Sequence, residues 1–194
     1  MGALSVARAS SGDQARAIST IVSAFIGDPV ERWLFPDPEQ YETRFPEFVA
    51  AFAGEAFERQ TVWALGGFRA VALWLAPGVT ADEAAIVAVL TEAVAPEKHD
   101  DMFSVLELME RAHPEFAHWY LPWLGVEQGA QGSGLGGQLL EHGLRIVDES
   151  HLPAYLETPN PRTVHFYERH GFEVSAESQA GACPPVISML RAAR

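Results

Sequence analysis

Glycines crowd the segment Gln131-Gly132-Ser133-Gly134-Leu135-Gly136-Gly137. An apolar run over 119–126 precedes it, and an amphipathic stretch from Leu135 to Ile146 follows it, so the order strand, turn, helix is predicted. Glycine adopts backbone conformations that are closed to other residues, which lets several N–H groups at a helix start converge on one phosphate. The pattern therefore predicts a cradle for a diphosphate-bearing cofactor.

Two other phosphate-binding motifs fit this segment less well. Gly132, Gly134 and Gly137 also spell G-x-G-x-x-G, with Glu157 at the distance expected of a dinucleotide-binding fingerprint. Only 57 residues follow Gly137, too few for a doubly wound sheet, and the preceding strand is not the first of the chain. A kinase-type P-loop is excluded because no Lys-Ser or Lys-Thr pair follows the glycines.

Length and composition indicate one acidic enzyme domain. The 194 residues suit a single domain over 1–194 with a full core, and 13 basic against 26 acidic residues give a net charge of −13. That charge argues against nucleic acid as a partner and favours cationic substrates. No window is long and apolar enough for a membrane span, and the first residues lack a secretory pattern, so no membrane and a cytoplasmic location are expected.

Strand and helix patterns alternate along the chain. A strand is expected over 4–8, a helix from about 11 that ends at Asp28-Pro29, a helical region over 38–59, and a hairpin of 61–65 with 68–76. Further helices are expected over 80–94, 101–112, 135–148 and 161–170, and further strands over 116–126, 153–158, 172–178 and 186–190. This order predicts an α+β fold, a mixed α/β sandwich.

A second motif makes the pattern specific. The spacing Gln131-x-x-Gly134-x-Gly136, a strand that ends in Glu157-Thr158, then Asn160 and the run from Phe166 to Phe172 resembles the GNAT superfamily of acetyl-CoA-dependent N-acetyltransferases. Within it, Leu156-Glu157-Thr158, Pro161-Arg162 and the same run are similar to the puromycin N-acetyltransferases. The resemblance covers about 116–191, which it implies is the acetyl-CoA-binding half, with 1–115 as the acceptor-side half.

The resemblance implies a mostly antiparallel sheet with a splay at its centre, where exposed backbone groups of one strand pair with the pantetheine arm. It also implies that backbone N–H groups hold the pyrophosphate without a metal. The cofactor-binding residues expected on this basis are Leu124, Gly125, Val126, Gln131, Gly132, Ser133, Gly134, Leu135, Gly136, Gly137, Asn160 and Tyr167.

Tyr167 is the expected catalytic acid. In the family the matching tyrosine gives a proton or hydrogen bond to the departing coenzyme A thiolate. The base is left open between Glu157 and His118, because period-2 alternation puts His118, Tyr120, Pro122 and Leu124 on the amine-facing side and no carboxylate lies among them.

The resemblance implies that the first two helical regions form the acceptor pocket. Aromatic walls and carboxylates there suit an aromatic or amphipathic amine. We predict that Asp28, Trp33 and Phe35 contact the acceptor together with Tyr120, and Glu31 belongs to the same segment.

The predicted function is direct acetyl transfer from acetyl-CoA to a primary amine of a small molecule, such as an antibiotic-like or aromatic amine. Cys183, the only cysteine, lies outside both motifs and carries no mark of a nucleophile. A non-catalytic acyl-CoA-binding sensor is the alternative. The protein is expected to be a monomer or homodimer.

Overall fold

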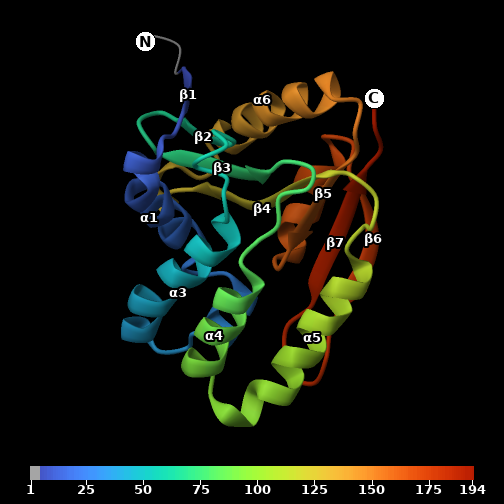
Figure 1. Cartoon of the computed structure of the whole chain (residues 1–194). Coiled ribbons are helices and arrows are strands. Elements are labelled where there is room, and N and C mark those ends of the chain that lie inside the picture. Colours follow the sequence, from blue (N-terminus) through green and yellow to red (C-terminus); the bar gives the residue numbers. More distant parts are fainter. Residues whose placement is uncertain (1–4) are drawn as a thin grey trace.

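Seven strands form one sheet across residues 5–194, the part of the chain that the computed structural model describes (Figure 1). Their order in space is β1-β2-β3-β4-β5-β7-β6, and every neighbouring pair is antiparallel except β4 with β5. This confirms the predicted α+β sandwich with a mostly antiparallel sheet. The strands are β1 Val6–Arg8, β2 Val62–Leu65, β3 Ala70–Leu75, β4 Trp119–Val126, β5 Ala154–Thr158, β6 Glu173–Ser178 and β7 Val186–Arg191.

Helices cover both faces of the sheet, and each face has its own apolar core. One core joins the sheet to the helices α1 Gln14–Phe25, α2 Pro29–Leu34, α3 Pro38–Ala53, α4 Glu83–Ala93 and α5 His99–Ala112. The other joins it to α6 Leu135–Glu149 and α7 Val164–Glu168. None of the helices in the described residues is long and apolar enough to cross a bilayer.

The sheet splits between β4 and β5. These strands pair only from Trp119 to Leu121 and from Ala154 to Leu156, whereas β4 continues to Val126. On this side, the second half of β4 therefore has backbone groups without a neighbouring strand. The splay predicted at the centre of the sheet is confirmed.

A bulge in β4 corrects the predicted side-chain alternation. Tyr120 lies opposite Leu75 and Trp123 opposite Leu73, so an advance of three residues along β4 matches an advance of two along β3. Tyr120 and Trp123 consequently lie in the same core, and Leu124 packs on the opposite face. Proline has no N–H for a sheet ladder and is found at such irregularities, which explains why Pro122 lies there.

Three predicted element boundaries are wrong or lie outside the described residues. Asp28-Pro29 is expected to end the first helix, but α1 already ends at Phe25 and Asp28 caps the start of α2. The helical region expected over 38–59 ends at Ala53, where Gly54 has a φ of 46° and turns follow. Leu4, expected in the first strand, lies outside the described residues.

Candidate active site

The glycine loop presents free backbone donors at the start of α6. Gly132 and Gly134 have φ angles of 75° and 82°, a region that L side chains rarely adopt. The N–H groups of Leu135, Gly136 and Gly137 lie in the first turn, where no preceding helical carbonyl can accept them. A Cβ on Gly136 would lie 3.3 Å from Val126 Cγ2, so the backbone here is close to the end of β4. This arrangement fits an anionic group at the helix N-terminus.

Side chains of the same loop hold its shape. Gln131 Nε2 donates to Val126 O at 3.1 Å and to Ala24 O at 3.4 Å, which ties the loop to β4 and α1. The Ser133 hydroxyl donates to Ala130 O, and Leu135 is buried in the core beneath α6. Ser133 and Leu135, both expected to bind the cofactor, do not line the cavity described next.

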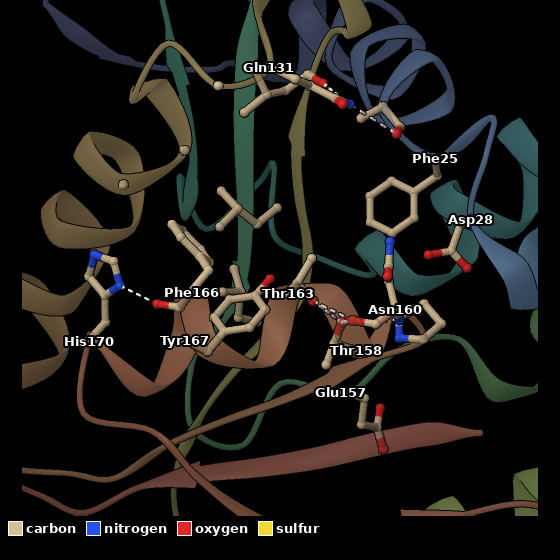
Figure 2. A pocket seen from close by; sticks show the side chains of 18 of the residues that line it. Phe25, Asp28, Gln131, Glu157, Thr158, Asn160, Thr163, Phe166, Tyr167 and His170 are labelled. Atoms are coloured by element: carbon tan, nitrogen blue, oxygen red, sulfur yellow. Dashed lines mark hydrogen bonds between the residues drawn. The ribbon is translucent and has the colours of Figure 1, made fainter.

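A cavity of about 900 Å³ runs from this loop across the split in the sheet (Figure 2). Its walls come from the end of α1, from β4, β5 and α6, and from α7. Leu124 and Val126 of β4 lie on it, whereas Gly125 faces α1, where a Cβ would lie 2.9 Å from Ala24 Cβ. Gly125 is thus required for the close packing of α1 on β4, and it does not line the cavity.

Tyr167 and Asn160 lie on the same cavity. The Tyr167 ring is buried between Phe166 and Phe172, and burial raises the pKa of its phenol, which is therefore protonated at neutral pH. Asn160 Oδ1 accepts from Arg162 N at 3.1 Å, which leaves the amide NH₂ available as a donor. Figure 2 shows both residues facing the open space below Gln131.

Glu157 lies at the end of β5 and is held by two tyrosines. Its Oε2 accepts from Tyr120 OH at 2.6 Å and its Oε1 from Tyr155 OH at 3.0 Å. Burial raises the pKa of Glu157, and the two phenol hydrogen bonds partly oppose this. The result is a carboxylate that holds a proton more readily than an ordinary glutamate.

His118 lines neither this cavity nor the smaller one described below. Its Nδ1 donates to Phe116 O at 2.7 Å and its Nε2 lies 3.1 Å from His113 Nε2. His113 packs edge-on against Tyr120 and Tyr155, and burial lowers the pKa of His113 to about 4. The expectation that His118 faces the amine is corrected. His118 instead packs edge-on against Tyr155, one of the two tyrosines that hold Glu157.

The predicted acceptor residues divide into two groups. Asp28 lines the large cavity, while Trp33 and Tyr120 line a smaller cavity of about 80 Å³ that meets it. Phe35 is fully buried against Phe45 and Phe48 and lines neither cavity, so it is a core residue. Asp28 is buried, and desolvation raises its pKa to about 6.

Residues 82–174 match the family model of the acetyltransferase (GNAT) domain. This match spans the split strand pair, the glycine loop and Tyr167. Over these residues, the chain is similar to GNAT acetyltransferase domains.

A relative of this chain is named as an N-acetyltransferase. The chain is 27% identical over 184 residues to an uncharacterized N-acetyltransferase, C550.08, of Schizosaccharomyces pombe. The alignment covers 85% of this chain and 72% of the relative. The matched domain family and this relative are both named acetyltransferases, so the chain is an N-acetyltransferase, and acetyl-CoA is the co-substrate of the domain family.

Solved structures share the GNAT fold along almost the whole chain. A Corynebacterium glutamicum structure described as histone acetyltransferase HPA2 and related acetyltransferase has a TM-score of 0.69 at 23% identity, covering 100% of this chain and 98% of that one. A Drosophila melanogaster polyamine N-acetyltransferase also has a TM-score of 0.69, at 16% identity, covering 97% and 99%.

Sequence reasoning missed two polar groups in the GNAT cavity. Thr158 Oγ1 and Thr163 Oγ1 are hydrogen-bonded at 2.6 Å, and Thr163 Oγ1 donates to Asn160 O at 2.8 Å. The capping sequence Asn160-Pro161-x-Thr163 was the available signal, because such residues close a turn through their side chains. This hydroxyl pair fixes the turn that carries Asn160 toward the cavity.

Proposed function

We propose that this N-acetyltransferase moves the acetyl group of acetyl-CoA directly to a primary amine of a small molecule. The observation that carries the proposal is the junction of the two cavities. Phe25, Pro122, Glu157 and Pro159 line both, so a thioester in the large cavity and an amine in the small one meet beside the Glu157 carboxylate.

Glu157 is the proposed base. An alkyl amine has a solution pKa near 10, so removing its proton at neutral pH costs about 4 kcal/mol. A carboxylate with a raised pKa is a stronger proton acceptor than an ordinary glutamate, and the Tyr120 and Tyr155 hydroxyls fix its orientation. Glu157 accepts the amine proton either directly or through one water molecule.

Tyr167 is the proposed acid. When the new amide forms, the carbon–sulfur bond breaks and the coenzyme A sulfur takes the electron pair. The phenol of Tyr167 faces the cavity in protonated form and gives its proton or a hydrogen bond to that sulfur. Cys183 offers no competing covalent route, because burial raises its thiol pKa to about 11 and it is not a thiolate at neutral pH.

The cofactor assignment follows the same geometry. Backbone groups of Leu124 to Val126 pair with the amides of the pantetheine arm, and the first-turn N–H groups of α6 hold the pyrophosphate. Asn160 donates to the arm. Gln131 is a positioning residue here, since its amide already bonds two backbone carbonyls.

A small amine is the proposed acceptor. The Drosophila neighbour is named a polyamine N-acetyltransferase that forms N-acetylagmatine, which supports an amine of this size. The resemblance to puromycin N-acetyltransferases lies over 156–172, in the cofactor half, and so leaves an antibiotic-like acceptor as one arm of the test.

Two measurements test the proposal. Calorimetry with acetyl-CoA should detect binding, and a thiol-release assay over alkyl, aromatic and aminonucleoside amines should detect turnover with at least one class. Binding without release for any amine would favour the non-catalytic sensor, and absence of binding would refute both.

A further inference from the structure

The small cavity is almost wholly apolar. Most of its wall is made of aromatic and aliphatic side chains from α1 to α5 and from β4, among them Phe25, Trp33, Phe52, Leu90, Met109 and Trp123. Its volume of about 80 Å³ is roughly half of the ~150 Å³ at which an apolar protein cavity accepts benzene. A slender hydrocarbon chain fits this space better than an aromatic ring.

Apart from Glu157, where the two cavities meet, one carboxylate interrupts these apolar walls. Glu31 is 3% exposed, lines the cavity, and its Oε2 has no hydrogen-bond partner among the described residues. Buried carboxylates are normally paired, because an unpaired charge in an apolar setting is costly. Burial and the nearby Asp28 both raise the pKa of Glu31.

Helix capping does not account for Glu31. The sequence Asp28-Pro29-Val30-Glu31 has the spacing of a capping box, in which Glu31 would accept the backbone N–H of Asp28. That N–H instead donates to Phe25 O at 2.9 Å. Asp28 Oδ1 caps α2 alone, by accepting from Val30 N at 3.0 Å and Glu31 N at 3.4 Å. The Glu31 carboxylate is thus left for the cavity.

We propose that Glu31 selects the acceptor: the small cavity takes an amine with a slender stem of roughly three to five carbons whose far end carries a hydrogen-bond donor for Glu31. This inference rests on the proposed acetyl transfer. The reacting amine lies at the Glu157 end, where the two cavities meet, and the stem runs between the apolar walls. A terminal ammonium or hydroxyl then supplies the donor that the protein itself does not.

Three amines of equal stem length test the selection: butylamine, 4-aminobutan-1-ol and 1,4-diaminobutane. In wild type, kcat/KM for the diamine should exceed that for butylamine by at least tenfold, since a hydrogen bond that involves its charged ammonium is worth about 1.5–3 kcal/mol, and the amino alcohol should lie between the two. In Glu31→Leu the order should reverse. In Glu31→Gln the diamine should lose more than the amino alcohol, because the amide accepts a hydrogen bond but carries no charge.

Glu110→Gln is the matched control. Glu110 is exposed on α5, next to the cavity-lining Met109, so this change also removes a carboxylate but leaves the cavity intact. It should keep the wild-type order of amines. Melting temperatures of all variants show that they are folded, and the Glu31 variants should melt at or above wild type because an unpaired buried carboxylate is removed.

Two results would overturn the inference: butylamine used as well as the donor-ended amines by wild type, or an unchanged order in Glu31→Leu. If wild type releases no coenzyme A with any amine, the proposed function fails by itself. Calorimetric affinity of the same three amines for wild type and Glu31→Leu then decides the role of Glu31 without turnover.

Discussion

Replacing Asp28 with asparagine should stabilise the protein at neutral pH and weaken the pH dependence of its stability. The Asp28 carboxyl is 6% exposed at the edge of the large cavity, and desolvation raises its pKa from 3.8 to about 6 despite two backbone hydrogen bonds. Asparagine caps helices about as well as aspartate, so the variant keeps the start of α2 while it removes the charge.

The size of the effect follows from this pKa. Each pKa unit corresponds to about 1.4 kcal/mol, so ionised Asp28 costs the folded state up to about 3 kcal/mol at pH 7. Between pH 4 and 6 the folded protein holds a proton that the unfolded chain has released. Stability therefore falls as pH rises through this window. Glu31, whose pKa is also raised, remains in the variant, so the slope should shrink rather than vanish.

Urea unfolding from pH 4 to pH 8 measures this effect. We expect Asp28→Asn to gain about 1–3 kcal/mol at pH 7 and to match wild type near pH 4. Asp37→Asn is the control, because Asp37 caps α3 from the same Asp-Pro sequence but is exposed. It should change stability by less than about 0.5 kcal/mol at any pH. A loss of stability at pH 7 in Asp28→Asn, or a curve parallel to wild type, would refute the reasoning.

Three further predictions concern the cofactor cavity. Tyr167→Phe should lower kcat at least tenfold while the Kd for coenzyme A measured by calorimetry stays within about twofold, because the ring packing is kept and only the acid is lost; unchanged turnover would exclude Tyr167 from the chemistry. In wild type, kcat/KM should fall as pH drops through the raised pKa of Glu157. Glu157→Gln should lower the maximum kcat/KM at least tenfold and remove this decrease at low pH. Superimposable pH profiles of the two proteins would exclude Glu157 as the base. Gly134→Ala should weaken coenzyme A binding, because a side chain at its φ of 82° costs about 1 kcal/mol of backbone strain. Gly129→Ala is the control, because a Cβ there has open space, and it should leave the affinity unchanged. Equal affinities in the two variants would contradict the proposed phosphate cradle.

The glycine loop and the turn at Asn160 could be predicted from the sequence because their signals are local. Glycines with positive φ, a helix start and the turn at Asn160 depend on residues close together in the chain. The helices, the strands and the split sheet followed from the same local patterns and from the family resemblance. Phe35 shows the limit, since an aromatic residue beside a pocket and one behind it have the same sequence signature.

The candidate base depended on tertiary detail that alternation does not contain. Counting by twos put His118 toward the amine, but the bulge moves Tyr120 and Trp123 to one face. Pro122 was the visible warning, because proline in a central strand marks an irregularity. Glu31 was equally hidden. Its spacing from Asp28 is typical of a cap, and only the hydrogen bond from Asp28 N to Phe25 O shows that the carboxylate is not used there.

Pro122 also explains why both cavities meet where they do. The β4–β5 pairing ends at Leu121 with Leu156, and the next residues are Pro122 on one strand and Glu157 on the other. Pro122 has no N–H to offer a neighbouring strand, so the strands can separate at this step without leaving a buried donor unpaired. The separation opens the large cavity and leaves Glu157 at its edge, beside the small cavity. One residue without a backbone donor thus accounts for the position of this carboxylate between the two cavities.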